Sequence, residues 1–180
     1  MDEIRCSLFK EANISGKLLE FGPGPGTNFK CFVNSTAIED YVGVEPNKHF
    51  EENMMIEKEK RGLTFPIHFS QLRGEDLTVP SESFDVVIMT HVMCSVESVE
   101  TVLANAERAL KSGGKIVFME HVKAEDGTKM KLFQDMVGPI FNIIGNGCQV
   151  RDLKTIFENA LGDRFVVEMM VEFDGKLQSI

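Results

Sequence analysis

A glycine-rich turn directly follows the first apolar segment of the chain, and it constrains the fold more than any other feature. Residues 17–21 predict a β-strand, residues 22–26 read Gly-Pro-Gly-Pro-Gly, and a helix is expected to begin near Thr27. Glycine has no Cβ and accepts positive φ, so a ligand can approach the backbone of such a turn closely. The segment therefore predicts a strand–turn–helix unit with a ligand site at the turn.

Apolar runs bounded by turn residues alternate with helix-like stretches along the rest of the chain. Further strands are expected at 41–44, 65–69, 84–89, 115–119 and 165–173, and helices at 50–60, 99–110, 129–144 and 152–161. The continuous apolar run at 84–89 predicts a central strand buried on both faces, and Pro66 places the third strand at a sheet edge. The glycines at 113 and 114 are expected to end the helix before the fifth strand. This alternation predicts an α/β fold with a doubly wound, mostly parallel, Rossmann-like sheet.

Size, charge and cysteine spacing limit the class of protein. The 180 residues fit one domain, 1–180, with residues 1–15 as an N-terminal helical segment, and we expect a monomer. The chain has 28 acidic and 19 basic residues, which argues against nucleic acid as a partner. It has no apolar stretch of membrane-spanning length and no secretory signal at residues 1–13. Four cysteines far apart, without a C-x-x-C pair, predict a cytoplasmic protein with neither a disulfide framework nor a zinc site.

Two acidic residues near the turn decide between candidate cofactors. Glu45 ends the next predicted strand, where a carboxylate can accept both hydroxyls of a ribose. A dinucleotide-binding G-x-G-x-x-G pattern needs glycine at position 27, where this chain has Thr27. Glu20, two residues before the first glycine, suits an ammonium group better than a pyrophosphate. The pattern favours S-adenosyl-L-methionine (SAM), which carries no phosphate; a nicotinamide-dependent oxidoreductase and a plain glycine-proline turn stay open as alternatives.

These residues resemble the motifs of the class I SAM-dependent methyltransferases. Residues 20–26 match E-x-G-x-G-x-G, residues 45–47 resemble the ribose-binding position, and residues 74–77 resemble the adenine loop before the fourth strand. Residues 110–114 resemble the L-x-P-G-G turn, with Ser112 in place of proline. The resemblance implies a methyltransferase fold and a set of cofactor-binding residues: Glu20, Gly22, Gly24, Gly26, Glu45, Pro46, Gly74, Glu75 and Thr90.

A narrower resemblance points to the methyltransferase-like thiol S-methyltransferases, which methylate small alkyl thiols. It rests on residues 26–29, 92–96, 118–122, 133–134 and 147–148, and covers about residues 4–173. It implies methyl transfer to a small thiol. The family carries an apolar N-terminal anchor ahead of the region matched here. The superfamily closes its sheet with a last antiparallel strand, which we expect this chain to lack, because it ends near the connection to that strand.

The resemblance also suggests a base for the acceptor thiol. His121 follows the fifth strand, within the Glu-His pair shared with the thiol-methylating family, and is our candidate catalytic residue. A histidine bonded to backbone is the alternative, and the same holds for His91. Cys94 and Cys148 are expected to be small buried apolar residues rather than nucleophiles. No metal is needed, a non-catalytic SAM-binding protein is the second hypothesis, and peripheral contact with a membrane stays open.

Overall fold

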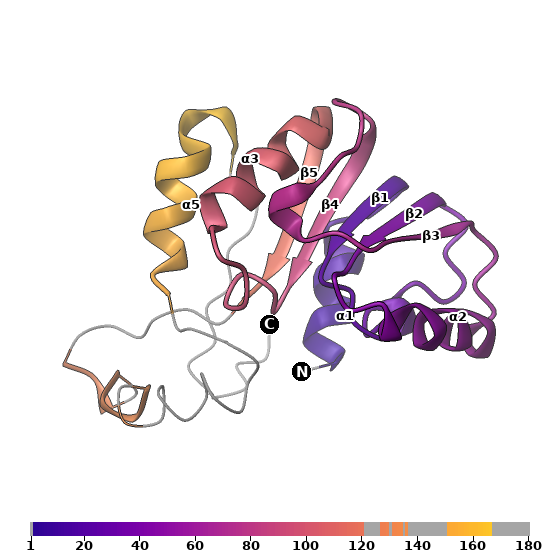
Figure 1. Cartoon of the computed structure of the whole chain (residues 1–180), viewed down its shortest axis with the longest axis horizontal. Coiled ribbons are helices and arrows are strands. Elements are labelled where there is room, and N and C mark those ends of the chain that lie inside the picture. Colours follow the sequence, from indigo (N-terminus) through magenta and orange to yellow (C-terminus); the bar gives the residue numbers. More distant parts are fainter. Residues whose placement is uncertain (1, 121–126, 130, 135, 137–150, 167–180) are drawn as a thin grey trace.

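A parallel β-sheet forms the centre of the molecule. The computed structural model describes residues 2–120, 127–129, 131–134, 136 and 151–166 (Figure 1). Within these residues the sheet has five strands in the order β3-β2-β1-β4-β5, and every pairing is parallel. The strands are β1 (Gly16–Phe21), β2 (Ile38–Val44), β3 (Ile67–Ser70), β4 (Phe84–Thr90) and β5 (Leu110–Met119). The predicted α/β fold with a Rossmann-like sheet is confirmed.

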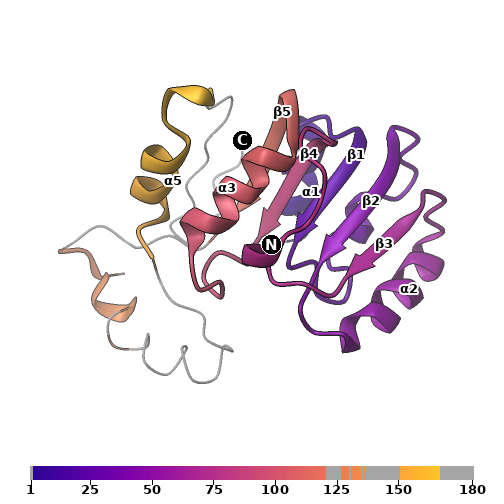
Figure 2. The same ribbon diagram turned by 45° about the horizontal axis from the view of Figure 1, so that its top comes forward.

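Helices cover both faces of this sheet (Figures 1 and 2). On one face lie α1 (Asp2–Glu11) and α2 (His49–Arg61), and on the other lie α3 (Val99–Ala109) and α5 (Leu153–Leu161). Short 3₁₀ turns are η1 (Phe29–Cys31), η2 (Gly74–Asp76) and η3 (Gly162–Arg164). None of the helices in the described part of the chain has the length and apolar character needed to cross a membrane.

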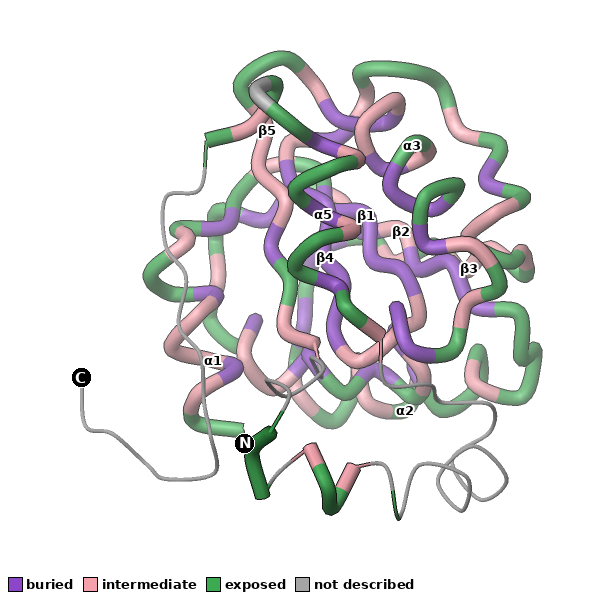
Figure 3. Tube along the Cα trace, turned by 90° about the vertical axis from the view of Figure 1, so that its left-hand side faces the viewer, coloured by how far each residue is buried: buried purple, intermediate pink, exposed green. Residues whose placement is uncertain are grey.

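The alternation of side chains along the strands divides the core into two layers. Leu18 and Ile88 pack beneath α1 and α2, whereas Leu19 and Val87 pack beneath α3 and α5. All four side chains have 0% exposure, so β1 and β4 are buried on both faces (Figure 3). The prediction that the fourth strand is central is confirmed. The third strand lies at the edge, directly after Pro66, as predicted.

Two local predictions differ from the structure. After the glycine turn the chain forms only the single turn η1, not a long helix. The third helix ends at Ala109, before the predicted glycine exit, because Leu110 takes an extended conformation and pairs with Phe84 of β4. The glycines at 113 and 114 therefore lie within β5. The predicted elements at 129–144 and 165–173 fall mostly outside the described residues.

The prediction against disulfides is wrong for one pair of cysteines. Cys6 of α1 and Cys31 of η1 form a disulfide across a sequence separation of 25 residues. Sequence spacing gave no sign of this bond, because it depends on α1 packing against η1 in the folded chain. Cys94 is a buried thiol, as expected. Cys148 lies outside the described residues.

Candidate cofactor site

The strand ends bring the predicted cofactor residues to one edge of the sheet. Because β1, β2 and β4 are adjacent and parallel, their carboxyl ends meet at the same edge. Glu20 is the second-to-last residue of β1, Glu45 directly follows β2, and Thr90 ends β4. In open parallel sheets the crevice at this edge is where ligands bind.

Glu20 is enclosed in a hydrogen-bonded network that connects three strands. Its side chain has 1% exposure, and its Oε2 accepts a hydrogen bond from the Tyr41 hydroxyl of β2 at 2.6 Å. The Asn28 Nδ2 donates to Glu20 Oε1 at 2.7 Å and to the Thr90 Oγ1 at 3.0 Å. Asn28 Oδ1 is buried, and no hydrogen-bond partner for it lies in the part of the chain that the structure describes. Asn28 therefore joins the ends of β1 and β4 and keeps one acceptor unused.

The charge of Glu20 is poorly compensated in this enclosure. Burial raises the pKa of Glu20 from 4.5 to about 7, while hydrogen bonds from Tyr41 and Asn28 and the charge of Arg5 partly offset that rise. Burial and the Glu20 charge raise the pKa of the Tyr41 hydroxyl well above its ordinary value, so it stays a donor. The direct partners of this carboxylate are thus neutral groups, and a cation close to the network stabilises its ionised form.

The glycine turn and Glu45 form the second half of the site. Glu45 Oε2 accepts a hydrogen bond from the Gly24 amide at 3.2 Å, and Oε1 accepts one from the Asn47 amide at 3.0 Å. Gly24 has φ +54°, and no heavy atom lies within 4 Å of where its Cβ would stand, so this side of the turn is open to a ligand. Gly22, with φ +63°, is required for packing, because a Cβ there would lie 2.5 Å from the Val92 Cγ2.

The remaining loop residues have visible structural roles. Gly26 is buried at the end of the turn, and Pro46 is exposed beside Glu45. Gly74 and Glu75 lie in η2, where both of their carbonyls accept hydrogen bonds from the Asn105 Nδ2 at 2.9 Å. The Glu75 Oε1 also accepts hydrogen bonds from two amides at the beginning of α3, at 2.7 and 3.2 Å. The predicted adenine loop is therefore fixed to α3 at the carboxyl edge.

The segment after β4 is held by the end of β5. Glu120 Oε1 accepts hydrogen bonds from the amides of Val92 at 2.9 Å and Met93 at 3.1 Å. The His91 amide donates to the Met119 carbonyl at 2.9 Å, and His91 has φ +54°, an uncommon conformation for a residue with a Cβ. This segment is thereby fixed over the glycine turn. His121, the candidate catalytic residue, lies outside the described residues.

Asn28 and Tyr41 are site residues that the sequence analysis missed. Tyr41 is the chain's one tyrosine and lies within a predicted buried strand. A buried tyrosine hydroxyl normally finds a hydrogen-bond partner, so its position was a usable signal. The resemblance over residues 26–29 included Asn28 without giving it a role. Its contact with Thr90, 62 residues away, had no local sequence signal.

Comparisons with known proteins agree with this geometry. The methyltransferase domain family matches residues 19–118, and the chain belongs to this family. The human thiol S-methyltransferase TMT1A is 36% identical over 152 residues, which are 82% of this chain and 61% of TMT1A. Rat thiol S-methyltransferase TMT1B is 36% identical over 135 residues, covering 74% of this chain and 54% of that protein. The chain thus spans about three fifths or less of the length of these relatives.

Solved structures share the fold at low sequence identity. YcgJ from Bacillus subtilis matches with a TM-score of 0.72 and 18% identity, covering 86% of this chain and 64% of that chain. A putative methyltransferase from Bacillus halodurans matches with a TM-score of 0.74 and 15% identity, covering 88% of this chain and 68% of that chain. These structures confirm the expected methyltransferase fold, and the match to the methyltransferase domain family supports its implied cofactor, SAM.

The residues at the carboxyl edge fit SAM. The open side of Gly24 lies beside the Glu45 carboxylate, a pair suited to the hydroxyls of an uncharged ribose. The enclosed Glu20 carboxylate and the unused Asn28 Oδ1 are acceptors for a cationic donor. The Glu20 carboxylate beside the glycine turn disfavours a pyrophosphate, which argues against the nicotinamide alternative. In the described ranges, no cluster of three or more His, Cys, Asp or Glu side chains is placed to hold a metal ion.

Proposed function

We propose that this protein transfers a methyl group from SAM to a small thiol. The observation that carries the proposal is the pairing of two acidic positions at one sheet edge, Glu20 with Asn28 and Glu45 with Gly24. The similarity to curated thiol S-methyltransferases supports a thiol as the acceptor.

Each predicted cofactor residue has a part in this proposal. Glu45 holds the ribose, and the backbone of the glycine turn lies against the cofactor. Glu20 acts on the cofactor's ammonium through Asn28, since its own oxygens are enclosed. Thr90 orients Asn28 from the end of β4. The other proposed contacts come from the glycine turn, the loop after β2 and the adenine loop: Gly22, Gly24, Gly26, Pro46, Gly74 and Glu75.

The chain's task in catalysis is alignment and deprotonation. When bound, SAM supplies an activated methyl group, so the protein has to hold the acceptor sulfur in line with it. The segment that Glu120 fixes after β4 is the wall against which the acceptor would be oriented. A thiol reacts as its thiolate, and we propose His121 as the base that removes the proton.

The direct test is a labelled-methyl assay with SAM and a panel of small alkyl thiols, phenols and amines. We expect label on thiols, and a Glu45→Ala variant should lose it together with SAM affinity. Asp40→Ala, in the strand that precedes Glu45 but outside the site, is the matched control and should keep both. Labelling of phenols or amines instead of thiols would show that the acceptor is not a thiol. Tight SAM binding without any methylated product would favour the non-catalytic alternative.

Domain organisation, oligomeric state, partners and location complete the proposal. We propose that residues 1–180 act as a single SAM-binding domain and as a monomer, without nucleic acid as a partner. The cytoplasmic location stays a prediction, and the Cys6–Cys31 disulfide removes one of its grounds, since disulfides are rare in reducing compartments.

A further inference from the structure

The N-terminal helix places an arginine in the interior beside the cofactor site. Arg5 of α1 has 7% exposure, although guanidinium groups are seldom buried without a partner. Its Nε is buried and finds no hydrogen-bond acceptor among the described residues. A guanidinium cannot lose its charge in a protein, so this donor needs an acceptor that the described chain does not supply.

Asp2, which forms an ion pair with Arg5, does not fill that role. The Arg5 Nη1 lies 3.7 Å from the Asp2 Oδ1, which is beyond hydrogen-bond distance. The same Asp2 oxygen is 2.5 Å from the Lys30 Nζ, and Asp2 is largely exposed. Asp2 therefore hydrogen-bonds Lys30, and its longer ion pair with Arg5 leaves the buried Arg5 Nε without an acceptor among the described residues.

Arg5 also acts on the Glu20 network. Its charge lowers the pKa of Glu20, although the direct hydrogen bonds of Glu20 come from Asn28 and Tyr41. The charge of buried Arg5 thus acts on the carboxylate that the proposed site offers to the ammonium of the cofactor. An amino acid has the complementary pair, an ammonium and a carboxylate on one carbon.

The disulfide fixes α1 in this position. Cys6, the residue after Arg5, is bonded to Cys31, and the Cys31 amide donates to the Asn28 carbonyl at 2.9 Å. The Phe9 and Phe32 rings pack beside this bond with centroids 5.5 Å apart. Arg5 in α1 and Asn28, directly before η1, therefore lie in two segments that the disulfide joins.

From this arrangement we infer that Arg5 binds the carboxylate of the cofactor's amino-acid end, beside the ammonium position served by Glu20 and Asn28. A planar guanidinium suits bidentate pairing with a carboxylate, and an enclosed position strengthens that pairing. The inference rests on the proposed SAM site and adds to it a residue, Arg5, that binds the cofactor's carboxylate.

The test compares SAM with decarboxylated SAM, which keeps the sulfonium, adenosine and ammonium but lacks the carboxylate. Binding of each is measured by calorimetry to wild type, Arg5→Met, which keeps the apolar stem, and Arg5→Lys, which keeps the charge. Lys10→Ala removes one positive charge from an exposed position of the same helix and is the matched control. Circular dichroism and melting temperature establish that each variant is folded.

We expect wild type and Lys10→Ala to prefer SAM by about 10- to 100-fold, as for loss of a charge-assisted hydrogen bond. Arg5→Met should weaken SAM binding by a similar factor, leave decarboxylated SAM within about twofold, and so erase the preference. Arg5→Lys should keep part of it. An unchanged preference in folded Arg5→Met overturns the inference and leaves the SAM site standing. Failure of wild type to bind either compound overturns the proposed function itself.

Discussion

Two carboxylates at opposite edges of the sheet show what distinguishes a binding position from a structural one. One lies near the carboxyl end of β1 and the other near the amino end of β4. Glu20, at the carboxyl edge, is enclosed, and its hydrogen bonds come from the neutral groups of Tyr41 and Asn28. Asp85, at the amino edge, is half-buried and accepts from the Lys111 Nζ at 2.7 Å and the Lys17 amide at 2.8 Å.

The pKa values of the two groups shift in opposite directions. Burial dominates at Glu20 and raises its pKa to about 7. At Asp85 burial is outweighed by the Lys111 hydrogen bond, the Lys17 amide and the charges of both lysines, which together lower the pKa. Asp85 is already satisfied, whereas the ionised form of Glu20 gains from an additional cation.

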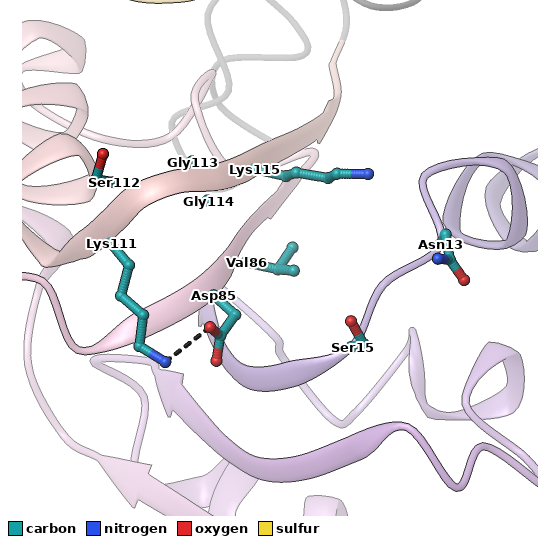
Figure 4. Close-up of a pocket in the computed structure, with 9 residues that line it drawn as sticks. All are labelled: Asn13, Ser15, Asp85, Val86, Lys111, Ser112, Gly113, Gly114 and Lys115. Carbon is teal, nitrogen blue, oxygen red and sulfur yellow. Dashed lines mark hydrogen bonds and ion pairs between the residues drawn. The ribbon is translucent and has the colours of Figure 1, made fainter.

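The surroundings of Asp85 agree with a structural role. It borders a cavity of about 280 Å³ with Ser15 and Lys115, and Figure 4 shows its pairing with Lys111, which also lines that cavity. The Lys115 Nζ donates to the Ala12 carbonyl at 3.1 Å, so this lysine also has a partner within the chain. At the amino edge the Asp85–Lys111 ion pair and the Lys115 hydrogen bond are thus both made within the chain, which agrees with a structural role for Asp85.

The largest expected difference between the two carboxylates is in SAM affinity. Glu20→Gln keeps the shape of the side chain but removes the charge, and we expect SAM binding at pH 8 to weaken by about 100-fold, as for loss of a buried ionic partner. Asp85→Asn should stay within about twofold of wild type. Calorimetric titration of both variants measures the contrast, and equal losses would remove the distinction between the two edges.

The second difference is in the pH dependence of stability without ligand. Because the folded pKa of Glu20 is raised from 4.5 to about 7, its stabilising contribution is complete below pH 4.5 and is lost as pH rises through 7. Relative to Glu20→Gln, wild type should lose about 3 kcal/mol of unfolding free energy between pH 4.5 and 8. Urea denaturation at several pH values measures this.

Asp85 should show the opposite sign. Its lowered pKa gives a contribution that is present above pH 3.8 and disappears as pH falls below that value. The difference in unfolding free energy between wild type and Asp85→Asn should therefore stay constant between pH 5 and 8 and shrink as the pH falls below 3.8. If the unfolding free energies of wild type and Glu20→Gln changed in parallel with pH, Glu20 would not be a buried carboxylate with a raised pKa.

The smallest expected effects come from removing one partner of each carboxylate. Tyr41→Phe deletes the donor to Glu20 Oε2 and should cost about 1–2 kcal/mol of unfolding free energy, since a buried charge loses a hydrogen bond. Lys111→Met breaks an ion pair that is partly exposed and should cost less than about 1 kcal/mol. Denaturant midpoints rank the two, and a larger loss in Lys111→Met would invert the comparison.

Local sequence patterns account for the part of the fold that was predicted correctly. The apolar run of β4 and Pro66 before β3 placed one strand at the centre and one at the edge. The glycine turn and Glu45 could be placed because each follows directly from a predicted strand end. These features depend on neighbours within a few residues.

The features that escaped prediction depend on distant contacts. Asn28 reaches Thr90 across 62 residues, and Cys6 reaches Cys31 across 25. Glu20 was predicted to face the ammonium, and its enclosure by Tyr41 and Asn28 is a property of the packed core. No periodicity in the chain could indicate that Arg5 would be buried beside this network.

Proton release on SAM binding tests the central claim most directly. Calorimetry at pH 6.5 in two buffers of different ionisation enthalpy gives the number of protons exchanged. If the cofactor's cation stabilises ionised Glu20, wild type should release about half a proton or more, and Glu20→Gln should release almost none. The same release from both proteins, or no SAM binding to wild type, would contradict the account.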